Sequence, residues 1–199
     1  GDGRPTITFD TANTASIAVS AASNYFENII FVANFLSIAA AFTLSTAKGF
    51  TLRGCEFRET SSVLNFLNIV KSTGAANTID RLDIQDCFWK GLGVTSISSF
   101  VLSADALNGV ILRRNRIIHD HAVDTSSLLK MTTGACLNLD CGDNIIVSKQ
   151  TAATAGVLLR QARASCKCGW ASRLVVLPAD VREIACPHCD EPLGLRPVL

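Results

Sequence analysis

The stretch "FTLRGCEF", residues 50–57, shares its order of apolar and polar residues with four other stretches of the chain. These are "IIFVANFL" (29–36), "LDIQDCFW" (82–89), "VILRRNRI" (110–117) and, more weakly, "LDCGDNII" (139–146). In chain order, the five starting residues are 21, 32, 28 and 29 positions apart. Such a period is typical of stacked supersecondary units, each too small to bury its own apolar face.

Within each unit the apolar or small residues fall at the first, third, sixth and eighth positions. The first two follow the alternation of a β-strand, and the longer step to the sixth predicts a sharp bend before a second short strand. We therefore expect the following side chains to be buried: Leu52, Phe57, Ile84, Trp89, Leu112 and Ile117.

The sixth position of the units predicts one aligned column, made of Asn34, Cys55, Cys87, Asn115 and Asn144. An Asn amide can both donate to and accept from the turn backbone and the next Asn in a stack. Cys fills the same place as a small apolar residue. We interpret the column as structural rather than catalytic, because no His lies near these thiols in sequence and buried thiols are inert.

A second set of apolar runs follows the units, at 63–70, 96–102, 126–131 and 155–160, and "TITF" (6–9) with "SIAV" (16–19) indicates an earlier, shorter coil. The residues predicted to be in phase are Leu44, Ile69, Leu102, Met131 and Leu159. The unit spacing also matches the leucine-rich-repeat pattern. Short β-rich runs instead of amphipathic helices favour two parallel strands per coil, and about six coils.

On these units, residues 1 to about 160 resemble the right-handed parallel β-helix of the pectate-lyase-like superfamily. The short coils rich in Ala, Thr and Ser are most similar to those of phage virion proteins. This resemblance implies a structural virion protein, as a capsid decoration or a tail-associated component. Many members of the superfamily cleave acidic polysaccharides, so a polysaccharide-active lyase or hydrolase is the alternative.

Glycoside hydrolysis needs paired carboxylates that face one groove. The candidate carboxylates are Asp80, Asp83, Asp86, Asp140 and Asp143. Stacking places Asp83 and Asp140 at the same outward position, but Ile111 of the coil between them separates the two. We therefore assign no catalytic residue.

The second polar concentration is "RRNRIIHDH", residues 113–121, with Arg113, Arg114, Arg116, His119, Asp120 and His121. A lyase could use an arginine base, but the Gly-His-Gly motif of pectin-cleaving hydrolases is absent from the sequence. Charge runs usually face water, which favours a solvated loop or an assembly contact.

After Arg160 the repeat stops, and two cysteine pairs, Cys166 with Cys168 and Cys186 with Cys189, flank a segment of 17 residues. Four thiolates can hold a tetrahedral Zn²⁺, and "RLVVL", "PAD" and "VREIA" between the pairs predict a hairpin. The segment resembles a zinc ribbon. It departs from that pattern in its first pair, C-x-C instead of C-x-x-C, so His188 remains an alternative ligand.

The charges of this segment nearly cancel, which does not favour a nucleic-acid partner. The whole chain has 18 basic and 17 acidic residues, so its net charge favours no charged partner. The sequence contains no run of about 18 apolar residues, so we expect no membrane-spanning helix. A mean hydropathy of +0.31 favours surface covered by other copies or neighbouring proteins, hence a homo-oligomer. The cysteine usage suits assembly in a reducing host cytoplasm.

The sequence thus predicts an all-β chain with a parallel β-helix over residues 1–162 and a zinc-ribbon-like module with a tail over 163–199. The expected partners are other virion proteins, such as capsid or tail subunits, and the expected location is the virion. The module is expected to cap the open end of the solenoid, whose strand edges would otherwise be exposed. An interaction adaptor, of the leucine-rich-repeat-like or the zinc-ribbon kind, is a third alternative.

Overall fold

The computed structural model describes residues 3–75, 78–92, 99–104, 106–119, 127–132, 136–148, 160–165, 171–177 and 194–197. The chain divides into two compact units, Gly1–Thr154 and Ala155–Leu199. The boundary at residue 162 that the sequence suggests stays a prediction. Every element among the described residues is a β-strand, which confirms the all-β class and disagrees with helices between the repeats.

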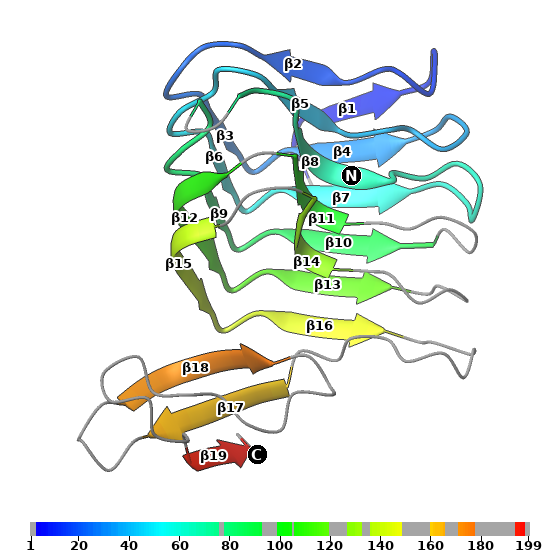
Figure 1. Cartoon of the computed structure of the whole chain (residues 1–199). Helices are drawn as coiled ribbons and strands as arrows, with labels where there is room; N and C mark the ends of the chain where they lie inside the picture. Colours follow the sequence, from blue (N-terminus) through cyan, green and yellow to red (C-terminus); the bar gives the residue numbers. More distant parts are fainter. Residues whose placement is uncertain are drawn as a thin grey trace. The chain divides into compact units, whose positions relative to one another are not determined.

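Three parallel sheets make up the first unit (Figure 1). Sheet A contains β1 (Thr6–Phe9), β4 (Ile30–Ala33), β7 (Glu56–Glu59), β10 (Phe88–Gly91), β13 (Arg116–His119) and β16 (Ile145–Ser148). Sheet B contains β2 (Ile17–Val19), β5 (Phe42–Leu44), β8 (Asn68–Ser72), β11 (Ser99–Ser103) and β14 (Ser127–Met131). Sheet C contains β3 (Tyr25–Glu27), β6 (Thr51–Arg53), β9 (Asp83–Gln85), β12 (Leu107–Arg113) and β15 (Cys136–Gly142).

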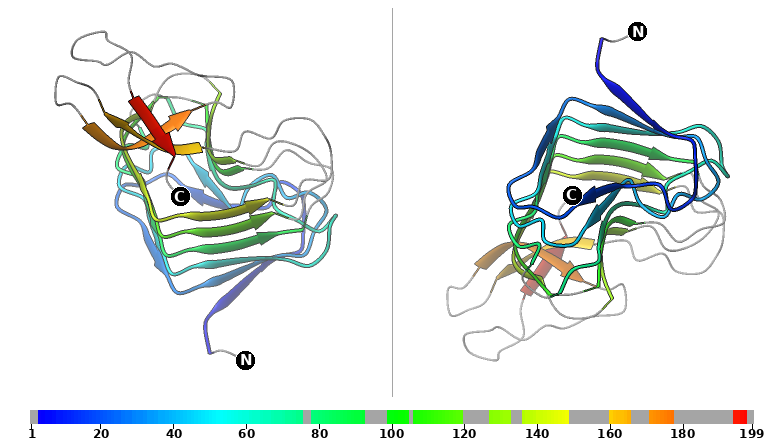
Figure 2. Two further views of the ribbon diagram at one scale, coloured as in Figure 1. Left: turned by 90° about the horizontal axis from the view of Figure 1, so that it is seen from below. Right: turned by 90° about the horizontal axis from the view of Figure 1, so that it is seen from above.

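Neighbouring strands in each sheet come three strands apart in the chain, as β4, β7 and β10 do in sheet A. The chain therefore visits the three sheets in turn and then starts the next coil, which is the architecture of a parallel β-solenoid. Figure 2 shows the same stacked strands from below and from above.

The six side chains predicted to be buried are all 0–1% exposed, which confirms that part of the pattern. In sheet C, Leu52, Ile84 and Leu112 form one column through the pairing of successive strands. In sheet A, Phe57, Trp89 and Ile117 form another. Aromatic rings continue the packing between sheets, with Phe100 of β11 6.2 Å from Trp89 and 6.3 Å from Phe57 between ring centroids. The stacked interior thus supplies the apolar burial that no single coil could provide.

The bend between sheets C and A is made by residues in the left-handed conformation. They are Asn28, Gly54, Asp86, Arg114 and Asp143, with φ between 53° and 59°. The N–H of Gly54 donates to the Gln85 carbonyl (3.2 Å), and that of Asp86 to the Arg113 carbonyl (3.1 Å). Each bend is thus hydrogen-bonded to the next coil, which explains the longer step between the third and sixth positions of the sequence unit.

The predicted column at the bend is confirmed for four residues and wrong for Asn34. Backbone hydrogen bonds place Ile29 beneath Cys55, followed by Cys87, Asn115 and Asn144. Asn34 is exposed beyond the end of β4. The first unit therefore spans residues 24–31, not 29–36. The prediction failed because an apolar Ile occupies the bend of this coil, while Asn34 lies five residues later within a similarly spaced apolar run.

The predicted phase of the second apolar runs is also wrong. Leu44 pairs with Ser72, and Leu102 pairs with Lys71 and Lys130, so neither aligns with Ile69. Leu159 lies outside the described residues. Consecutive residues of these strands, such as Ile69 and Val70, are both buried at 0–1% exposure. Where every residue is buried, alternation carries no register information.

The second unit contains a three-stranded antiparallel sheet in the order β18-β17-β19. Its strands are β17 (Arg160–Ser165), β18 (Ala171–Leu177) and β19 (Gly194–Pro197). Strand β18 includes the predicted "RLVVL" strand and pairs with β17. The predicted hairpin partner, residues 181–185, lies outside the described residues.

Candidate functional site

The outer face of sheet C carries most of the residues that the sequence offered as catalytic candidates. Ile111 pairs with Asp83 on one side and with Asp140 on the other. This confirms that an apolar side chain separates the two carboxylates. The geometry does not bring them together as the facing pair that glycoside hydrolysis requires.

Arginines from adjacent coils form ion pairs with three carboxylates of sheet C and its bend. The pairs are Arg53–Asp83, Arg113–Asp140 and Arg114–Asp86, with N–O distances of 3.0, 2.9 and 2.7 Å. The Arg114 guanidinium binds Asp86 through two nitrogens and also donates to Gln85 Oε1 at 2.8 Å. Each ion pair links two adjacent coils of the solenoid.

The pKa of the Asp86 carboxyl lies below its ordinary value. The hydrogen bonds from Arg114 are the main cause, and partial desolvation opposes them. The pKa of the Arg114 guanidinium is raised for the same reason. A carboxylate held ionised in this way is a poor proton donor, because general acid catalysis works best with a pKa near the operating pH.

The segment 113–121 is split by the bend. Arg113 and Arg114 lie at the end of sheet C, whereas Arg116 belongs to β13 of sheet A and lies 5.8 Å from the centroid of the Phe88 ring. Asp120 and His121 lie outside the described residues. The three arginines therefore serve two different faces of the solenoid.

The thiols of the bend column are enclosed. Cys55 and Cys87 are each 1% exposed, and Cys87 Sγ lies 3.3 Å from the Gln85 carbonyl. The hydrogen bond between the two sulfurs raises the pKa of the Cys87 thiol, and burial raises it further, while the same hydrogen bond lowers the pKa of the Cys55 thiol to about 7. Because both residues are 1% exposed, neither sulfur is reached by a substrate or a metal ion, which supports the structural interpretation.

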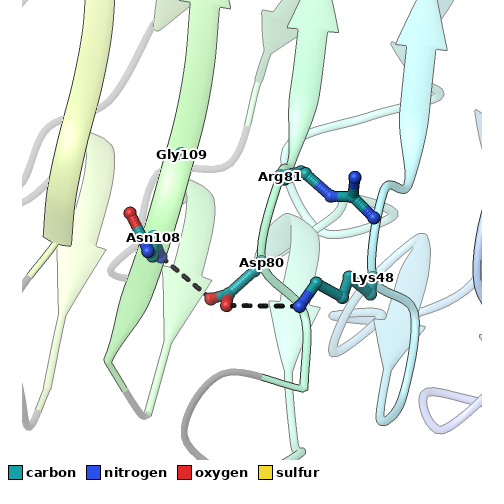
Figure 3. A pocket seen from close by; sticks show the side chains of 5 residues that line it. All are labelled: Lys48, Asp80, Arg81, Asn108 and Gly109. Carbon is teal, nitrogen blue, oxygen red and sulfur yellow. Dashed lines mark hydrogen bonds and ion pairs between the residues drawn. The ribbon is translucent and has the colours of Figure 1, made fainter.

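A polar hollow of about 320 Å³ lies at the opposite end of the sheet C strands, where each coil arrives from sheet B (Figure 3). It is lined by Lys48, Asp80, Arg81, Asn108 and Gly109, and we call it the corner hollow. The Asn108 N–H donates to Asp80 Oδ1 at 3.0 Å, and Lys48 Nζ lies 3.9 Å from Asp80 Oδ2. The sequence singled out only Asp80 of this set, because its partners come from three different coils.

A buried carboxylate that the sequence pattern missed is Glu59 at the end of β7. It is 8% exposed and accepts hydrogen bonds from Trp89 Nε1 (3.0 Å), the Phe66 N–H (3.2 Å) and the Leu92 N–H (2.5 Å). The sequence pattern did not point to Glu59, because the repeated eight-residue unit ends at residue 57, two residues earlier. Glu59 ties the ends of two coils together.

The four predicted zinc ligands, Cys166, Cys168, Cys186 and Cys189, lie outside the described residues, as does His188. In the part of the chain that is described, no three His, Cys, Asp or Glu side chains come together as a metal site. The zinc assignment stays a prediction.

No protein-family model, no curated protein and no solved structure matches this chain. Among the described residues no helix is long and apolar enough to cross a membrane. What is established is the parallel β-solenoid fold.

Proposed function

We propose that this chain is a structural protein that acts through protein–protein contacts, as a building block of a phage virion. Within this proposal it is a capsid decoration or a tail-associated component, and its solenoid is right-handed with about six coils. The single observation that carries the proposal is the pairing of the sheet C carboxylates with arginines of adjacent coils. These groups hold coils to one another and present no free acid–base pair.

Exposed apolar side chains support a role in assembly. Leu137 and Leu139 of β15 and Ile145 and Val147 of β16 are 44–59% exposed. Contiguous exposed apolar surface is one mark of a protein–protein interaction site. In the virion proposal, other subunits cover such surface.

Residues 163–199 form, in this proposal, a zinc-ribbon-like module with Cys166, Cys168, Cys186 and Cys189 as the ligands. By sequence position the first pair falls between the antiparallel strands β17 and β18, and the second pair falls between β18 and β19. Cysteine pairs that connect short antiparallel strands are the usual arrangement of small zinc modules. So short a segment has too little apolar core to fold without a staple.

The virion assignment is tested by copurification. An antibody raised against the purified chain is used to probe particles banded on a density gradient from the source culture. We expect the chain to band with intact particles and to resist release by high salt. A chain found entirely outside the particle fractions contradicts the assignment.

The enzyme alternative is tested on the same purified chain with acidic and neutral polysaccharides, with and without Ca²⁺. We expect no turnover. Cleavage that disappears in Asp83→Ala or Arg113→Ala would place the polysaccharide-active alternative first.

The metal proposal is tested by elemental analysis of the purified chain, which should return about one zinc per chain. We expect the zinc to be lost in Cys186→Ser and to be retained in His188→Ala.

A further inference from the structure

Arg81 stands apart from the other arginines of the solenoid. Those that pair with carboxylates are Arg4, Arg53, Arg58, Arg113 and Arg114, and Arg116 lies over the Phe88 ring. The exposed Arg81 guanidinium has no hydrogen-bond or ion-pair partner among the described residues. An exposed arginine without a carboxylate partner is available to an incoming anion.

The backbone at Arg81 is strained. Its φ is +59°, in the left-handed region that side chains other than Gly rarely adopt. The neighbouring coils place Gly49 and Gly109 at the equivalent positions, with φ of +74° and +72°. Because these glycines have no side chains, the corner hollow remains open on both sides of Arg81.

Asp80, in the floor of the corner hollow, has unused acceptor capacity. The residue is 7% exposed, and Oδ1 accepts from the Asn108 N–H at 3.0 Å. The nearest cation, Lys48 Nζ, is 3.9 Å from Oδ2, which is beyond hydrogen-bond distance. A carboxylate oxygen has two lone pairs, so Oδ2 can accept a hydrogen bond from water or from the donor of a ligand.

We propose that the corner hollow binds a small carboxylate ligand with a hydroxyl or ammonium donor beside the carboxylate. The Arg81 guanidinium and the Lys48 ammonium bind the carboxylate through charge-assisted hydrogen bonds. The adjacent donor fills the open position on Asp80 Oδ2. The hollow, of about 320 Å³, is open to solvent and has room for a ligand of a few heavy atoms. This site does not depend on the structural role proposed above.

Lactate, glycine, acetate and glycerol serve as probes for an NMR titration of the full ¹⁵N-labelled chain. We expect lactate or glycine to shift the amide signals of Asn108 and Gly109 and the Nε–H signal of Arg81 in a saturable way. Acetate, which lacks the donor, should bind about tenfold more weakly. Glycerol, which lacks the charge, should produce no saturable shift. Equal affinity for acetate and for both donor-bearing probes overturns the proposal.

Arg81→Gly is the decisive variant, because glycine preserves the left-handed backbone. We expect the dissociation constant of the stronger probe to rise at least about tenfold. Arg116→Gln on sheet A removes the same single charge and should leave the dissociation constant unchanged. Unsaturable shifts, or the same affinity in Arg81→Gly as in the unaltered chain, contradict the site. Asp80→Asn keeps an acceptor for Asn108 and should abolish the preference over acetate.

Discussion

Both ends of sheet C turn through a column of left-handed residues, yet the two ends handle charge differently. At the strand ends, Asp86 and Arg114 lie on adjacent coils and form a bidentate ion pair. At the strand starts, Gly49 and Gly109 flank Arg81, whose guanidinium has no partner in the described part of the chain. The same backbone conformation therefore builds a clamp between coils at one edge and an open polar hollow at the other.

The interior between these two edges should produce the largest effect on stability. Ile84 is 0% exposed and pairs with Leu52 and Leu112 of the adjacent coils. We expect Ile84→Ala to lower the free energy of unfolding by about 2 to 5 kcal/mol through lost burial and a residual cavity. Denaturant unfolding measures the change. Ile111→Ala, on the outer face, is the control and should cost about 1 kcal/mol or less.

Substitution in the bend column should give the second largest loss in the free energy of unfolding. Asn115 is 1% exposed; its Oδ1 accepts from the Cys87 N–H at 3.1 Å, and its Nδ2 donates to the Ile84 carbonyl at 2.9 Å. Asn115→Ala leaves both backbone groups without these partners, so we expect a loss of about 1 to 3 kcal/mol. Asn34→Ala, at an exposed Asn outside the column, should change stability by less than about 0.5 kcal/mol. Equal losses in the two variants would restore the alignment first suggested by the sequence.

Glycine substitution compares the two left-handed columns directly. Arg81→Gly relieves the strain at φ +59° without breaking an ion pair, so we expect a gain of about 1 kcal/mol or less. Arg114→Gly relieves the same strain at φ +53° but loses the Asp86 pair, so its net effect should be near zero. Thermal unfolding of both variants measures the difference. A larger gain in Arg114→Gly would mean that its ion pair contributes nothing.

The smallest effect concerns pH. The pKa of Asp86 is lowered in the folded chain by the hydrogen bonds from Arg114. Its contribution to stability is therefore present above the ordinary Asp pKa of about 3.9 and is lost as pH falls through the lower folded value. In ¹³C NMR titration of the carboxyl groups, Arg114→Gln should return the pKa of Asp86 toward the ordinary range. A pKa unchanged by the substitution would assign the shift to other groups.

The strands in which buried apolar residues alternate with outward polar residues were predictable from the sequence. The strands in which consecutive residues are both buried were not. Leu52 and Ile84 were predictable because alternation at the strand set each buried side chain beside outward polar ones. The sheet B register was not, because Ile69 and Val70 are both buried. The bend column was misread in one coil, where Ile29 takes the place of Asn or Cys.

The candidate sites divide in the same way. The separation of Asp83 from Asp140 by Ile111 follows from counting positions in the repeat, and it was predictable. The corner hollow was not predictable, because it depends on missing side chains at Gly49 and Gly109 and on which of the described arginines is left without a partner. Such ion pairs join residues that are far apart in the chain, so a local sequence pattern does not predict them.

Cys55, Cys87, Asn115 and Asn144 are stacked in one column, and Ile29 rather than Asn34 completes it. Adjacent coils then bring their amide protons to about 4.8 Å, the spacing of neighbouring strands. NOE spectra of a chain selectively labelled at Asn, Cys and Ile measure this directly. We expect an unbroken series of inter-coil contacts from Ile29 to Asn144. A contact between Asn34 and Cys55, or no contact between Cys87 and Asn115, would contradict it.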